Sequence, residues 1–245
     1  MGAYYNATIK FADDKNSKWV KYNSWDCDNS PKLMAHSHIG NLYNSSVLSL
    51  LYSRKGHLVW LCDYHEDKKL NWDTVENAES WNPTPLKKPY IIANHSKKKF
   101  ISLKGILSAV LKKIEINDLK YADFHVFEEN GEEKIGLFII HPLPLLVNSE
   151  KGAAGGGDYY HNYPMRRKWA KDIIEVLDED KETELIKNNY KDISDKTIVP
   201  MKWYFEELDT RRFLFEKFLR ENIGDSFYDI KTKIKAVEEY FLKSF

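Results

Sequence analysis

The chain has 245 residues, a length that fits one elaborated domain or one domain with a helical extension. Hydrophobic residues make up 42% of it, and 7 Trp, 15 Tyr and 12 Phe are present, so the composition excludes a generally disordered chain. Lys plus Arg and Asp plus Glu number 37 each, which excludes a global basic field that would attract nucleic acid or an anionic membrane.

Cysteine usage and hydropathy indicate a cellular location. Cys27 and Cys62 are the only cysteines, too few for a disulfide framework. No apolar run reaches the roughly 18–20 residues that a membrane-spanning helix needs, and the N-terminus does not resemble a secretory signal. We therefore expect a soluble, cytoplasmic protein without a membrane partner.

The first sixty residues carry strand and helix patterns in alternation. Apolar and polar side chains alternate over 5–11, and a polar turn leads into 18–22, which predicts a β-hairpin. Apolar residues recur at helical spacing over 42–51, and Gly56 is a suitable residue to end that helix. The apolar run His57–Cys62 follows, and we expect it to be a central strand.

Residues 63–88 form a long polar stretch that contains Trp72 and Trp81. A loop of this length in a compact domain is usually functional, and the two tryptophans predict that it packs down as a flap. Beyond it, the sequence predicts two more hairpins, within 90–103 and 124–140, with a short helix over 105–113 between them.

The last third of the chain has a different character. Residues 172–177 fit a strand or a helix, whereas 201–245 predict two antiparallel helices. The order of elements favours an α+β fold with a mostly antiparallel sheet, built from hairpins with interspersed helices. We expect a core domain at 1–200 and a C-terminal helical hairpin at 201–245, packed on the core or extending it.

The segment from His141 to Pro164 is the most unusual in the chain. An apolar strand ends at His141-Pro142, because proline cannot donate to a strand ladder, and four glycines then occur within six residues. Such glycines let backbone N–H groups converge on an anion or phosphate, and the polar, aromatic and basic residues after them could contact it. The predicted ligand-binding residues are Gly152, Gly155, Gly156, Gly157, Asp158, Tyr159, His161, Arg166 and Arg167.

This segment matches no established phosphate-binding motif. No Gly-Lys-Ser/Thr follows the glycines, as it does in a Walker loop, and the GxGxxG spacing of dinucleotide-binding folds is absent. A flexible surface connector is the alternative interpretation, and composition alone favours it.

Two residues near predicted strand ends are the candidates for catalysis. Asp63 follows the central strand, where partial desolvation could tune it as a base, and His36 is a second candidate. The alternative role for Asp63 is in a turn or a helix cap. Cys27 lies between Asp26 and Asp28, which raise the pKa of its thiol and make it a poor nucleophile.

Four side chains raise the question of a metal site. His36, His38, Cys62 and His65 include ligand types that zinc prefers. Paired CxxC spacing is absent, and nothing in the sequence fixes the distance between the two halves, so we predict hydrogen-bonded histidines and no metal site. The sequence identifies no cofactor.

These observations lead to two hypotheses about function. In the first, the protein binds, and could turn over, a small anionic or nucleotide-like ligand at the glycine-rich segment. In the second, it is a non-catalytic interaction or inhibitor protein of the kind that phages encode, and the aromatic C-terminal helices contact a partner or a second copy. The run Arg166–Trp169 combines basic and aromatic residues as single-stranded nucleic-acid binders do, but no motif for sequence-specific recognition is present.

Overall fold

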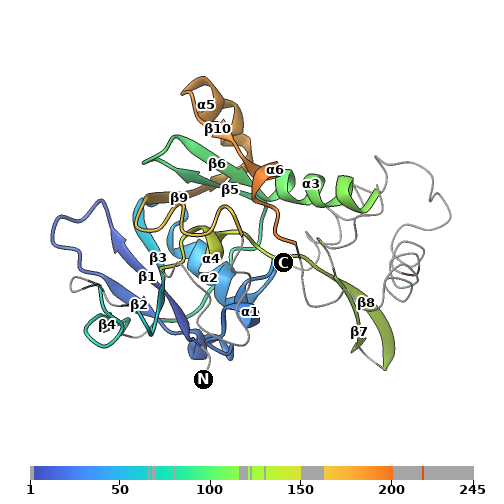
Figure 1. The fold of residues 1–245 in the computed structure, drawn as a ribbon, viewed down its shortest axis with the longest axis horizontal. Coiled ribbons are helices and arrows are strands. Elements are labelled where there is room, and N and C mark those ends of the chain that lie inside the picture. The colour runs from blue at the N-terminus through green and yellow to red at the C-terminus, as the bar shows by residue number, and fades with distance from the viewer. Residues whose placement is uncertain are drawn as a thin grey trace.

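An eight-stranded sheet forms the centre of the protein in this computed structural model (Figure 1). The structure describes residues 3–65, 67, 70–79, 81–115, 121, 123–129, 131–149, 163–200 and 217. The strand order is β10-β6-β5-β9-β3-β1-β2-β4. The strands are β1 (Tyr5–Phe11), β2 (Val20–Tyr22), β3 (Gly56–Cys62), β4 (Glu76–Asn77), β5 (Tyr90–Asn94), β6 (Lys99–Ser102), β9 (Ile173–Asp178) and β10 (Lys191–Asp192).

The hairpins predicted at the N-terminus and at 90–103 are confirmed. β1 pairs antiparallel with β2, and β5 pairs antiparallel with β6. β3 pairs with β1 over its whole length, from Cys62 opposite Tyr5 to Gly56 opposite Phe11, and it is a central strand as expected. Gly56 begins this strand and does not end the preceding helix. A Cβ there would lie 2.8 Å from a terminal methyl of the buried Leu51 side chain, which would have to shift to admit any larger residue.

The α+β class is confirmed, but the prediction of a mostly antiparallel sheet is wrong, because the sheet is mixed. β10 pairs parallel with β6 at one edge, and β2 pairs parallel with β4 at the other. Both edge strands are two residues long, and each joins the sheet after a long connection instead of a tight turn. Local sequence patterns detect hairpins, and they do not detect such distant pairings.

Residues 172–177, for which the sequence fits a strand or a helix, lie in strand β9 (Ile173–Asp178) except for Asp172. This strand pairs antiparallel with β5 on one side and with β3 on the other. Without it the two groups of strands, β10-β6-β5 and β3-β1-β2-β4, would not be joined in one sheet. Pairing on both sides therefore decides a conformation that the local sequence leaves open.

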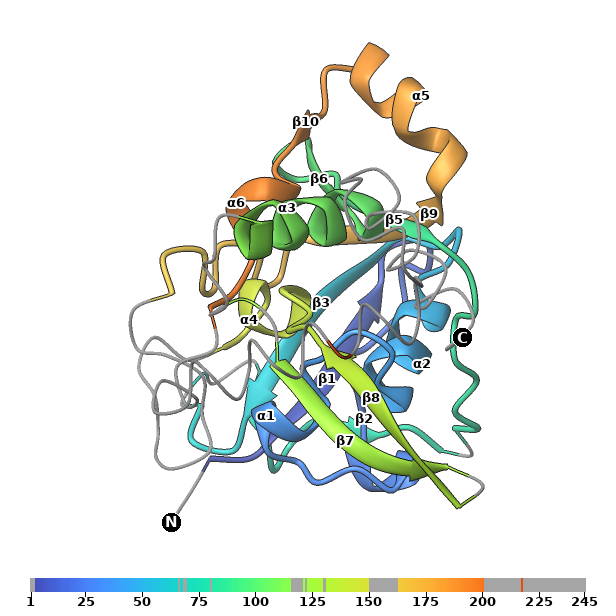
Figure 2. The ribbon, with the colours of Figure 1, turned by 90° about the vertical axis from the view of Figure 1, so that its right-hand side faces the viewer.

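Helices cover one face of the sheet and enclose the main core (Figures 1 and 2). The α-helices are α1 (Leu33–His36), α2 (Leu42–Leu50), α3 (Leu103–Glu115), α4 (Leu143–Leu146), α5 (Glu182–Lys187) and α6 (Ser194–Thr197). Side chains of α2, α3 and α4 pack in this core with Trp60 of β3 and Val176 of β9. The opposite face carries two smaller clusters, one beneath α5 and one around Val59 and Leu61.

The hairpin predicted within 124–140 is confirmed, but it stands apart from the main sheet. β7 (Asp123–Glu129) and β8 (Glu132–Phe138) pair only with each other among the described strands (Figure 1). The predicted helix pair at 201–245 lies outside the described residues, apart from Lys217, so it and the domain boundary stay predictions. Among the described helices, none has the length and apolar character to cross a membrane.

His141 links the end of this hairpin to α4. β8 ends at Phe138, three residues before the predicted stop at His141-Pro142. The His141 ring is fully buried: its Nδ1 accepts from the N–H of Leu143 at 3.1 Å, and its Nε2 donates to the Tyr90 hydroxyl at 2.9 Å. Burial, with a smaller effect of His38, lowers the pKa of His141 from 6.5 to about 3.

This buried histidine predicts a loss of stability in acid. The unfolded chain binds a proton on His141 below about pH 6.5, whereas the folded chain binds it only near pH 3. The stabilisation that the neutral His141 ring gives to the folded protein is therefore complete above about pH 6.5. It is lost as the pH falls toward about 3, by up to about 1.4 kcal/mol per pH unit. His141→Asn should flatten the dependence of the free energy of unfolding on pH between 6 and 4, as measured by urea denaturation. Parallel curves for the two proteins throughout that range would contradict it.

Candidate functional site

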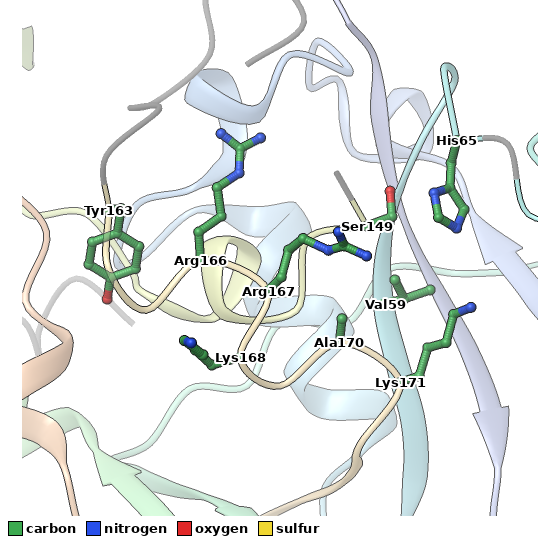
Figure 3. A pocket seen from close by; sticks show the side chains of 9 residues that line it. All are labelled: Val59, His65, Ser149, Tyr163, Arg166, Arg167, Lys168, Ala170 and Lys171. Carbon is green, nitrogen blue, oxygen red and sulfur yellow. The ribbon is translucent and has the colours of Figure 1, made fainter. Parts of the chain in front are cut away.

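A cleft of about 500 Å³ opens beside β3, between two segments that are distant in sequence (Figure 3). One wall is the stretch 163–171, here called the basic loop, and the other includes His65 at the start of the 63–88 flap. The described residues that line the cleft are Val59, His65, Ser149, Tyr163, Arg166, Arg167, Lys168, Ala170 and Lys171.

Main-chain hydrogen bonds fix the basic loop to its neighbours. The N–H of Arg167 donates to the carbonyl of Leu145 at 2.9 Å, and the N–H of Trp169 donates to the carbonyl of Leu146 at 2.8 Å. The N–H of Lys171 donates to the carbonyl of Leu58, also at 2.9 Å. The loop therefore follows α4 and then β3, and its basic side chains project from a fixed backbone.

Two residues of the basic loop adopt a left-handed backbone conformation. Arg167 has φ 63° and Lys171 has φ 66°, values that residues with a Cβ adopt at an energetic cost. Such strain persists where the surrounding structure imposes it, and it is common at binding and catalytic sites. Here the hydrogen bonds to Leu145 and Leu58 impose it.

The lining of the cleft is strongly cationic. Arg166 is only 8% exposed, and its Nη2 donates to the Asn148 side chain at 3.4 Å. Arg167 and Lys168 make no ion pair within the part of the chain that the structure describes. Lys171 pairs with Asp67, and the His65 ring lies 3.9 Å from the same carboxylate. Basic side chains of the loop on one wall and His65 on the other thus border the same cleft (Figure 3).

The floor of the cleft is apolar and continues into a packed cluster. Val59 and Ala170 line the cleft, and both belong to the cluster on the outer face of the sheet that also contains Trp72. Trp81 packs on the opposite face, with its ring edge-on to Tyr22 and Tyr43. The described part of the flap is therefore held by both tryptophans, as the sequence predicts.

Of the predicted ligand-binding residues, the structure brings Arg166 and Arg167 into the cleft. The other seven, Gly152, Gly155, Gly156, Gly157, Asp158, Tyr159 and His161, lie outside the described residues. Ser149 and Tyr163, the described residues nearest to that segment on either side, both line the cleft. Trp169 is fully buried in the core, so it offers no stacking surface for a base.

Neither candidate for catalysis is among the described lining residues. His36 is fully buried; its Nε2 accepts from Trp60 Nε1 at 2.8 Å, and its Nδ1 donates to the Ser30 carbonyl at 3.3 Å. Burial lowers the pKa of His36 to about 3, so the ring is neutral near pH 7. Asp63 Oδ1 accepts from the N–H of Tyr4 at 3.0 Å, a contact that extends the β1–β3 pairing.

The side chains considered for a metal site are spread over different environments. Within the described residues, no group of three His, Cys, Asp or Glu side chains is arranged to hold a metal ion. His38 stacks on Phe138 with ring centroids 4.6 Å apart, whereas His65 lies at the cleft. The backbone N–H of Cys62 donates to Ser149 Oγ at 2.8 Å.

The sequence did not indicate three of the polar residues in the cleft as anion contacts: His65, Ser149 and Lys171. The basic loop had a detectable signal, because four of its nine residues are Arg or Lys. His65 and Ser149 had no such signal in the sequence, because they reach the cleft only through the folded sheet. The N–H of Ser149, for example, donates to the carbonyl of Trp60 in β3 at 2.9 Å.

No known protein family, curated protein or solved structure matches the chain. The assignment of a function therefore rests on the chemistry of the cleft.

Both thiols should be unreactive in the folded protein. Cys27 and Cys62 are buried, and burial, followed by Asp26 and Asp28, raises the pKa of Cys27 to about 12. A disulfide reagent at pH 8 should therefore modify neither thiol until denaturant is added, as followed by absorbance. Rapid modification of one thiol in the native protein would contradict this arrangement.

Proposed function

We propose that the protein binds a small anionic ligand, a phosphate or a nucleotide-like phosphate ester, in the cationic cleft. The observation that carries the proposal is the pair Arg167 and Lys168, two cations without an ion-pair partner among the described residues, in a concave space that Arg166 and Lys171 also line. Unpaired cations on a fixed backbone can engage an incoming anion without first losing a protein carboxylate.

The chemistry of the lining favours phosphate over other anions. Guanidinium groups bind phosphate oxygens in pairs, and a lysine adds a compact point charge. The cleft volume of about 500 Å³ falls within the range of small-molecule sites, so it can admit a ligand larger than inorganic phosphate. Ala170, which packs against the cluster of the fully buried Val59, offers an apolar surface to the uncharged part of such a ligand.

The proposal concerns binding. Asp63 and His36 remain the sequence-based candidates for turnover, and they do not line the cleft among the described residues. The alternative of an interaction or inhibitor protein depends on residues 201–245, which lie outside the described residues apart from Lys217. No feature of the described structure favours that alternative.

Titration calorimetry with inorganic pyrophosphate and with ADP tests the proposal. Both should bind in low-salt buffer, and the affinity should fall as salt is added, because the site is open to solvent and salt screens its charges. Absence of heat and of any rise in melting temperature with either compound at millimolar concentration would overturn the proposal.

Removing the two unpaired cations should weaken binding. Arg167→Gln with Lys168→Gln should reduce the affinity for pyrophosphate by about a hundredfold or more, since each of the two charged hydrogen bonds contributes roughly 1.5–3 kcal/mol. Lys187→Gln with Lys191→Gln is the matched control: it removes two exposed charges from α5 and β10, away from the cleft. Equal losses in the two double variants would show that only net charge matters.

A further inference from the structure

Asp67 is an acidic side chain that contacts the cationic lining of the cleft. Its Oδ2 forms an ion pair with the Nζ of Lys171, and the same oxygen lies 3.9 Å from His65 Nε2. Lys171 and His65 both line the cleft and come from opposite walls. One carboxylate of the protein therefore faces two of the groups that would contact a bound anion.

The ion pair between Asp67 and Lys171 is accessible to solvent. The Lys171 side chain is 43% exposed and that of Asp67 is 31% exposed. Ion pairs at this exposure contribute little to stability, because water competes for both charges. A ligand that carries more than one negative charge can therefore replace Asp67 at Lys171 and gain from Arg167 and Lys168 at the same time.

We propose that Asp67 is a built-in competitor of the ligand: it occupies Lys171 in the free protein and must release it when an anion binds. This inference rests on the proposed function, because it concerns the same cleft. It assigns Asp67 the role of setting the affinity of the site. A singly charged anion would only exchange one carboxylate for another charge of equal size, whereas a polyvalent phosphate gains additional contacts.

A purely structural role for the ion pair makes a different prediction. Lys171 belongs to the basic loop and Asp67 to the flap, so the pair also connects the two walls. If that connection were its only effect, removing the carboxylate would lower the melting temperature of the free protein and leave the affinity unchanged.

The test uses inorganic pyrophosphate and calorimetry on the full chain. Asp67→Asn should bind pyrophosphate about two- to fivefold more tightly than the unaltered protein, the gain expected from removing an exposed ion pair. Asp13→Asn is the matched control, because it breaks the exposed pair of Asp13 with Arg54 outside the cleft. This control should leave the affinity unchanged.

A second variant isolates the competition for Lys171. Lys171→Met should weaken binding, and adding Asp67→Asn to it should restore little, because the competition of Asp67 with the ligand for Lys171 is then already removed. If Asp67→Asn raised the affinity for pyrophosphate equally in the unaltered protein and in Lys171→Met, competition for Lys171 would be refuted. Electrostatic repulsion of the anion by Asp67 would then explain the gain. Binding by the unaltered protein with no gain in Asp67→Asn would refute the role of Asp67 alone, whereas no binding by any variant would refute the proposed function itself.

Discussion

The cleft depends on the attachment of the basic loop to the body of the protein. Three main-chain N–H groups, of Arg167, Trp169 and Lys171, donate to carbonyls of α4 and β3, and the Trp169 ring is buried in the main core. These contacts oppose the mutual repulsion of four cationic side chains within nine residues. Charged groups that would move apart in a free peptide are thus held close together. The entropic cost of ordering them is met when the chain folds, so it does not reduce the affinity for a ligand.

The concentration of positive charge is local, because the whole chain carries equal numbers of acidic and basic residues. Some basic groups elsewhere on the described surface pair with carboxylates, for example Lys88 with Asp178 and Lys97 with Asp172. Arg167 and Lys168 differ from these because they line a cleft together with Arg166 and Lys171. Overall net charge conveys little about such a site, since the range of electrostatic attraction in salt is about 10 Å.

Much of the fold could be predicted from the sequence, whereas the site could be predicted only in part. Alternating side chains identify β1 and a short apolar run identifies β3, because these signals act between near neighbours. The parallel edge strands and the place of β9 could not be predicted, since they depend on pairing between distant segments. The same reason applies to the cleft: Arg166 and Arg167 stand out by composition, but the approach of His65 and Ser149 follows from the folded sheet.

The position of β9 has a consequence for biosynthesis. The strand that connects the two halves of the sheet is among the last to be made, after β1, β3, β5 and β6. While the ribosome is still adding residues up to 178, the earlier strands β3 and β5 present unsatisfied edges to solvent. Nascent chains of this protein should therefore be good substrates for chaperones that shield exposed strands, and the cleft beside β3 cannot assemble until translation has passed this point.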